Sequence, residues 1–197
     1  MNKIYVFIIF LIICLFTSRT FSLSSSSYLI ANSAVSSFDY EEASIYFEKS
    51  TLNNFSENDL EKKLIVFVNT NNLLKAFNVS EKILLKNNTN QEAWLIYLIY
   101  AKLNNLKEPF KIFENLKKVE NLEIIEYIFY NLDSKIKNDQ LISKNIFKIV
   151  NSASNENIND FQNYNYLIFY INSSLILNKE YDEANYYLGA LYEKLKN

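Results

Sequence analysis

The side chains that most often carry enzyme chemistry are almost absent from this sequence. It contains no histidine, which excludes an imidazole base, a histidine-held metal ion and a Ser-His-Asp triad. The single cysteine, Cys14, lies in an apolar N-terminal run, and the single glycine, Gly189, is too few for a phosphate-binding loop. The acidic residues are spread over predicted helix faces without a paired constellation. We therefore expect no catalytic residue, no metal site and no cofactor.

The charge pattern argues against nucleic acid as a partner. The chain has 20 basic and 22 acidic residues, and its net charge is −2. Nearly all of the basic residues are lysines, and they form no dense cluster. Nucleic-acid-binding surfaces normally show clustered lysine and arginine, so we expect no nucleic-acid function.

The first residues predict an export signal. Lys3 precedes an apolar run of about 12 residues, from Tyr5 to Phe16. This run is shorter than the ~20 residues that cross a bilayer and matches a signal-peptide core. Thr20 and Ser22 fit positions −3 and −1 of a cleavage site. We expect residues 1–22 to be a signal peptide, with an uncleaved membrane anchor as the alternative, and the remainder to lie in the periplasm or at the cell envelope.

The rest of the chain must be positioned by helices. One glycine and one proline cannot supply the turns and bulges of a sheet protein. Apolar residues recur at helical spacing, and asparagine-rich breaks separate the predicted helices at 53–54, 69–72, 87–90 and 104–105. Asparagine tolerates the left-handed conformation that ends many helices. We therefore predict an all-α fold.

The predicted helices repeat with a period of 33 to 34 residues. Ala43, Ala76 and Pro109 lie at this interval, and Phe113 falls where Phe47 falls in the first copy. Pro109 replaces the small alanine, but it lies in the first turn of its helix, where proline is tolerated. This period predicts stacked helix pairs.

The spacing of Tyr40, Ala43, Phe47 and Ser50 resembles the second helix of a tetratricopeptide repeat. In that family an aromatic residue opens the helix, and a small residue, a large residue and a second small residue follow at these intervals. Ala43 would allow close approach of the partner helix.

The C-terminal segment 181–197 resembles the first helix of the same repeat. Leu188, Gly189 and Tyr192 have the Leu-Gly-x-x-Tyr spacing that typifies it, and Gly189 would lie at the helix crossing. The chain is most similar to exported tetratricopeptide-repeat proteins of alphaproteobacteria. In this register Asn197 follows the first helix of a pair, so we expect the chain to be a fragment of a longer repeat protein, with a capping helix as the alternative.

The resemblance implies a helix-turn-helix solenoid that forms a right-handed superhelix. Three helix pairs are expected in 24–118, and a degenerate pair with a loop in 119–160. A further helix and the first helix of another repeat are expected in 161–197. Within the middle region, we expect helices over 122–132 and 140–150 and a loop over 151–160. A compact all-α bundle is the alternative architecture.

Such a solenoid would line a concave groove with its first helices, which implies a non-enzymatic scaffold that binds a peptide or a partner helix. By register, the candidate binding residues are Tyr28, Asn32, Val35, Trp94, Leu98 and Ala101. Two other functions remain open: a membrane-tethered assembly factor, and the helical part of a longer envelope enzyme. The membrane would be contacted only through an uncleaved N-terminal segment.

Overall fold

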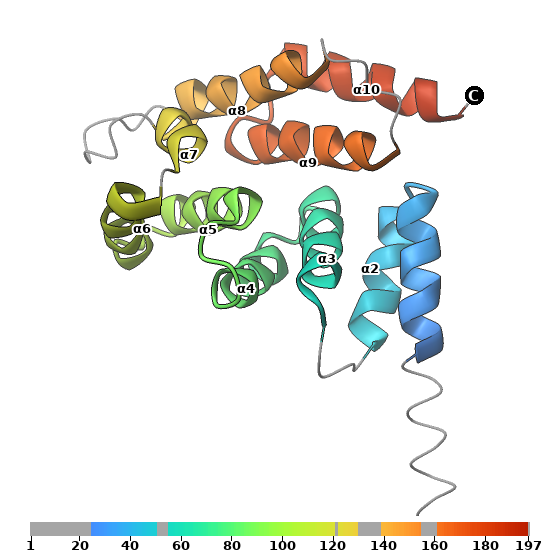
Figure 1. Cartoon of the computed structure of the whole chain (residues 1–197). Coiled ribbons are helices and arrows are strands. Elements are labelled where there is room, and N and C mark those ends of the chain that lie inside the picture. The colour runs from blue at the N-terminus through green and yellow to red at the C-terminus, as the bar shows by residue number, and fades with distance from the viewer. Residues whose placement is uncertain (1–24, 51–54, 121, 130–138, 155–160, 197) are drawn as a thin grey trace, which may run out of the picture. The chain divides into compact units, whose positions relative to one another are not determined.

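The computed structural model describes residues 25–50, 55–120, 122–129, 139–154 and 161–196, and all regular structure within these ranges is helical (Figure 1). The predicted all-α class is therefore confirmed. The chain divides into two compact units, one that ends at Phe55 and one that begins at Ser56. The three helix pairs expected in 24–118 thus fall into different units, because the second and third pairs share a core with the C-terminal helices.

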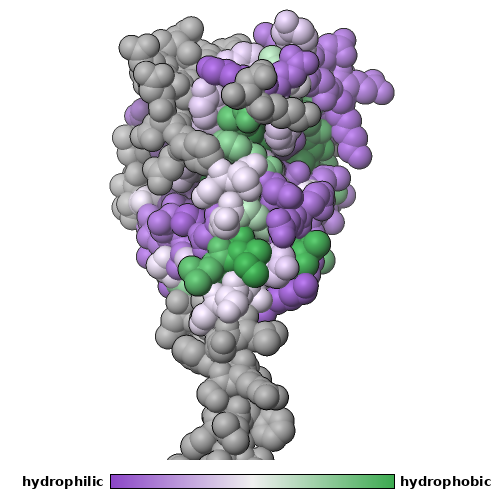
Figure 2. Space-filling model, turned by 90° about the vertical axis from the view of Figure 1, so that its right-hand side faces the viewer, coloured by the Kyte–Doolittle hydropathy of each residue, from purple (hydrophilic) through white to green (hydrophobic). Residues whose placement is uncertain are grey.

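The first unit is a helical hairpin. Residues 25–36 form one helix and α2, Tyr40–Lys49, forms the other. The Tyr28 and Phe47 rings lie 6.4 Å apart between the two helices, and Ala43 is fully buried, as a closely approaching partner requires. Large apolar side chains remain on the surface of this unit, with Leu29 exposed to 67% and Ile45 to 52%. Figure 2 shows apolar patches between polar side chains on the face that it presents.

The second unit contains the remaining helices. They are α3 (Glu57–Asn69), α4 (Leu73–Leu84), α5 (Gln91–Leu103), α6 (Glu108–Glu120), α7 (Glu123–Ile128), α8 (Asp139–Ser154), α9 (Phe161–Leu177) and α10 (Asp182–Lys196). Successive helices pack against each other from α3 to α6 and from α7 to α10, as in a helical repeat solenoid.

The turns inside the first three helix pairs share one backbone geometry. Each contains one residue with a left-handed φ, close to 55° in all cases: Phe38 (58°), Asn71 (54°) and Asn105 (56°). The next N–H in each turn donates to the carbonyl five residues earlier: Asp39 to Ala34 at 2.9 Å, Asn72 to Phe67 at 2.7 Å, and Leu106 to Ala101 at 2.8 Å. These are Schellman helix ends, which satisfy carbonyls that the helix itself leaves unpaired. The predicted period of 33 to 34 residues is thus visible in the backbone.

Side chains follow the same period. Ala76 is fully buried, and Pro109 is buried in the first turn of α6, as expected. Tyr40, Phe47 and Phe113 are also buried, with exposures of 5%, 1% and 0%. The repeat-defining residues of the first three pairs therefore belong to the core.

Helix α9 lies at the centre of the second unit. It packs against α8, α10 and α3, and Figure 1 shows it between α8 and α10 on one side and α3 and α5 on the other. Leu167, Ile168, Phe169 and Ile171 are all exposed to 4% or less. Repeats in a linear solenoid contact only their neighbours, so the return of α9 onto α3 adds a long-range contact to the stack.

Two serines join α8 to α9. Ser143 Oγ donates to the Ser174 carbonyl at 3.0 Å, and Ser174 Oγ donates to the Ser143 carbonyl at 2.9 Å. Both residues are fully buried. These small side chains let the two helices approach closely while both hydroxyls keep a partner.

Two predicted boundaries in the C-terminal half need correction. Helix α8 continues to Ser154, so residues 151–154 are helical and not part of a loop. Helix α7 ends at Ile128, with Phe129 as its C-cap, so it is shorter than the helix predicted over 122–132. Helix α9, Phe161–Leu177, lies in the range 161–197 where a further helix was expected. Residues 130–132, 155–160 and the predicted signal segment 1–22 lie outside the described residues.

Gly189 does not lie at a close helix crossing. It is exposed on α10, and an added Cβ would meet no heavy atom within 4 Å. Leu188 and Tyr192 are half-buried, whereas Tyr186 is 79% exposed. The helix packs on α9 through Ala184 and Leu191 instead, so the glycine faces away from the described neighbours. Among the described residues, no helix combines the length and apolar character that crossing a membrane needs.

Candidate functional site

The predicted binding residues on α5 are core residues in this structure. Trp94, Leu98 and Ala101 are exposed to 2%, 0% and 0%. Helix α5 is apolar on nearly all sides, and such a helix must be buried on all sides. Leu98 and Ala101 therefore offer little surface to a partner in this conformation, and peptide binding by them remains a prediction, whereas Trp94 reaches the edge of a pocket described below.

The predicted residues in the first unit serve its own hairpin. Tyr28 lies against Phe47 and also 6.1 Å from the Phe55 ring. Asn32 Nδ2 donates to the Tyr28 carbonyl at 2.9 Å, and Val35 is 7% exposed. Tyr28 and Asn32 remain half-exposed, so their role in binding is likewise still a prediction.

Helix α9 packs on α3 and is hydrogen-bonded to α5, the first helices of the second and third pairs. The Tyr170 hydroxyl donates to Glu92 Oε1 of α5 at 2.8 Å. Asn172 Nδ2 donates to Asn69 Oδ1 at the end of α3 at 2.9 Å. The helices that would line a peptide groove are thus engaged by a helix of the same chain.

Burial shapes the electrostatics of this contact. Desolvation, followed by the negative charge of Glu92, raises the pKa of Tyr170 well above its usual value. Desolvation and the neighbouring Glu61 carboxylate raise the pKa of Tyr166 to about 12. Burial also raises the pKa of Glu61, and the hydrogen bond that Asn90 Nδ2 donates to Glu61 Oε1 at 2.7 Å opposes part of this increase. The contact therefore favours neutral tyrosines.

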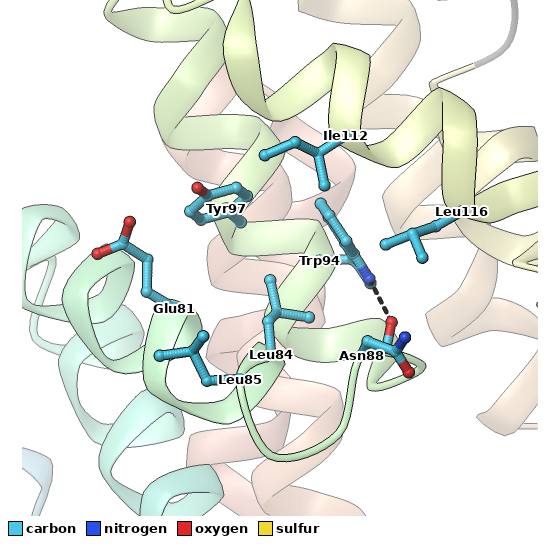
Figure 3. Close-up of a pocket in the computed structure, with 8 residues that line it drawn as sticks. All are labelled: Glu81, Leu84, Leu85, Asn88, Trp94, Tyr97, Ile112 and Leu116. Atoms are coloured by element: carbon cyan, nitrogen blue, oxygen red, sulfur yellow. Dashed lines mark hydrogen bonds between the residues drawn. The ribbon is translucent and has the colours of Figure 1, made fainter.

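An open pocket of about 340 Å³ lies between α4, α5 and α6 (Figure 3). This volume is at the small end of the range for ligand pockets. The lining residues come from α4, the α4–α5 turn, α5 and α6: Glu81, Leu84, Leu85, Asn88, Trp94, Tyr97, Ile112 and Leu116.

Trp94 forms a fixed wall of the pocket. Its Nε1 donates to the Asn88 carbonyl at 2.8 Å, which ties the α4–α5 turn to α5 (Figure 3). Its ring packs edge-on against Phe113 at 5.4 Å and against Tyr97 at 5.6 Å. Tyr97 in turn stacks on Phe77 of α4 at 4.9 Å. Two aromatic contacts and the Nε1 hydrogen bond hold the indole in place, so this wall of the pocket is preformed.

The mouth of the pocket combines apolar and acidic side chains. Leu85 is 87% exposed and Ile112 is 40% exposed. Desolvation raises the pKa of Tyr97, and the negative charges of Glu81 and Glu108 raise it further. Glu81 lines the pocket and is the acidic group at its mouth, whereas Glu108 acts on the Tyr97 hydroxyl without lining the pocket.

The lining supports binding by apolar contact and a few directed polar contacts. It offers aliphatic and aromatic walls, one carboxylate, one carboxamide and one phenol. Within the described ranges, no three acidic, cysteine or histidine side chains form a group that could hold a metal ion.

Sequence reasoning found one of the eight lining residues, Trp94, and placed it in a different groove. The signal that could have identified the pocket is Leu85. It is a large apolar residue at the end of α4, just before an asparagine-rich turn, where no core is available to bury it. An exposed apolar residue next to other apolar side chains marks an interaction site more often than an apolar residue that stands alone on the surface.

This pocket, built around Trp94, is the candidate site of the described residues. It differs from the predicted groove in its position, between α4, α5 and α6, and in its open, partly acidic mouth. Comparison of the chain with protein-family models, with curated proteins and with solved structures gave no match.

Proposed function

We propose that the chain is a non-enzymatic tetratricopeptide-type interaction module of the cell envelope, which binds a peptide or a partner helix through the Trp94 pocket. The observation that carries the proposal is a preformed apolar pocket whose rim leucine, Leu85, is 87% exposed. Exposed leucine in contact with a cavity is unfavourable in water and becomes favourable when a partner covers it.

Two further features support parts of this proposal. The Schellman turns at 33 to 34 residue intervals are in keeping with repeated helix pairs. The apolar run from Tyr5 to Phe16 supports export. The cell fraction and the mass of the native protein test export. A chain in the envelope that begins near residue 23 supports it, and a full-length chain in the cytoplasm contradicts it.

The location of the binding surface follows from α9. Because α9 packs on α3 and is hydrogen-bonded to α5, a partner that used those faces would have to displace a helix whose apolar residues are almost fully buried. The pocket between α4, α5 and α6 needs no such rearrangement. We therefore place the binding site there.

Selection of short peptides from a random displayed library tests the proposal. Selected peptides should change the emission of Trp94, which is the chain's one tryptophan. Replacing Leu85 or Ile112 by glutamine should weaken their binding at least about tenfold, because covering one large aliphatic side chain contributes about 1.5–3 kcal/mol.

The matched control is Leu74→Gln, an exposed leucine of α4 (56%) that does not line the pocket. It should leave the affinity unchanged. Failure to select any peptide, or equal affinity for all three variants, would refute binding through this pocket.

A further inference from the structure

We propose that the pocket selects partner segments in which a large apolar side chain lies next to a lysine or arginine. The apolar side chain enters the space beside Trp94, and the cation pairs with the Glu81 carboxylate at the mouth. This inference rests on the proposed interaction function and specifies the chemistry of its partner.

The size of the pocket sets the first requirement. A volume of about 340 Å³ accommodates a large side chain with part of its backbone, but not a whole helix. Leu84, Leu85, Ile112 and Leu116 give it aliphatic walls, and Trp94 gives it an aromatic one (Figure 3). A leucine, methionine or phenylalanine of the partner matches this lining, because apolar anchors in preformed pockets supply most of the affinity of such contacts.

The charge at the mouth sets the second requirement. Glu81 is the one charged side chain among the described residues that line the pocket. It is exposed, and no described lysine or arginine forms an ion pair with it. Lys82 and Lys86, its closest lysines in the sequence, do not line the pocket. A bound cation would therefore meet a carboxylate whose charge no described cation neutralises by direct pairing.

The charge at the mouth acts on bound groups of either sign. A partner carboxylate beside the apolar anchor would face the negative charge of Glu81, which lines the pocket. Complementary charge at the rim of an interface selects among partners more than it adds affinity, so the acidic mouth should act as a filter for basic segments.

Short synthetic peptides of matched composition provide the test. Each carries a central leucine or phenylalanine, and its flanking residues are lysine, glutamine or glutamate. None contains tryptophan, so the emission of Trp94 reports binding directly to the full-length protein. An exposed ion pair changes affinity about threefold, so peptides with lysine should bind about tenfold more tightly than peptides with glutamate at low salt, with glutamine in between. High salt should reduce the difference.

Variants of Glu81 assign the preference to the pocket. Glu81→Gln should remove most of it and Glu81→Lys should reverse it, whereas Glu123→Gln, an exposed carboxylate of α7, should leave it intact. Exposed substitutions of this kind leave the fold unchanged, which circular dichroism verifies.

The outcomes separate the two proposals. Peptides that bind, lose affinity with Leu85→Gln and show no preference for lysine would overturn the charge filter and leave the proposed function standing. The charge filter is likewise overturned if Glu81→Gln keeps the preference for lysine. Peptides of every charge that fail to bind would overturn both proposals.

Discussion

Replacing Tyr170 by phenylalanine should destabilise the unit formed by residues 56–196. The hydroxyl of Tyr170 donates to Glu92 Oε1 at 2.8 Å and provides a polar link between α9 and α5. The phenylalanine ring fills the same space, so the substitution removes the hydrogen bond and little else. The change therefore measures how strongly the hydrogen bond holds α9 in place.

The magnitude follows from the chemistry of the bond. Hydrogen bonds to charged groups contribute about 1.5–3 kcal/mol. Glu92 is half-exposed, so water can solvate the freed carboxylate, and we expect the low end, about 1.5 kcal/mol. For a protein of this size, 1 kcal/mol corresponds to roughly 2–4 °C in Tm, which predicts a decrease of about 3–6 °C.

Urea unfolding followed by circular dichroism gives the free energy of unfolding of each variant. Tyr186→Phe is the matched control, because Tyr186 is 79% exposed on α10 and should tolerate the change. A double-mutant cycle with Glu92→Ala isolates the pair, and we expect a coupling free energy of at least about 1 kcal/mol.

Equal stability of Tyr170→Phe and Tyr186→Phe would refute this reasoning. A coupling free energy near zero in the cycle would do so as well, even if Tyr170→Phe alone were destabilised. Either result would mean that the hydrogen bond to Glu92 contributes nothing to holding α9 in place.

Three further predictions concern the turns, the serine pair and alkaline pH. Because Asn105 has a φ of 56°, Asn105→Gly should raise the free energy of unfolding by up to about 1 kcal/mol, and Asn105→Val should lower it by about 1–2 kcal/mol, as measured in urea. Ser143→Ala should lower the free energy of unfolding by about 1 kcal/mol through loss of the hydrogen bond to Ser174, and Ser143→Leu should lower it further by overpacking. Equal stability of both variants and the unsubstituted protein would contradict the close packing of α8 and α9. The pKa of Tyr166 is raised to about 12 and that of Tyr170 is also raised, whereas unfolded tyrosine ionises near 10. The free energy of unfolding should therefore decrease as the pH rises from about 10 to 12. Tyrosinate absorbance should show that these tyrosines ionise late, together with unfolding.

The sequence predicts the features of the fold that depend on local chemistry. The 33-residue spacing of Ala43, Ala76 and Pro109 predicts buried positions, and the asparagine-rich breaks predict left-handed turns at Asn71 and Asn105. Both depend on a few neighbouring residues and on helical periodicity. Phe38 is the exception, because a bulky residue rarely adopts a left-handed φ and nothing in its side chain predicts one.

The position of α9 could not be predicted in this way. Its sequence is apolar on almost all sides, which indicates burial but does not identify the elements that bury it. Contacts such as the hydrogen bond between Asn172 and Asn69 join residues far apart in the sequence, so they depend on how all the intervening helices are arranged. The candidate site was missed for the same reason: Trp94 is recognisable as an anchor, but its pocket is formed by Leu85 and Ile112, whose exposure depends on how three helices meet.

The link between Asn69 and Asn172 spans 103 residues, and this separation has a consequence for the order of folding. Helix pairs close to each other in sequence can form early, but α3 must wait for α9, which follows much later in the chain. During that interval the chain displays the apolar surface that α9 will cover. Chaperone binding and aggregation therefore compete with folding until α9 has docked.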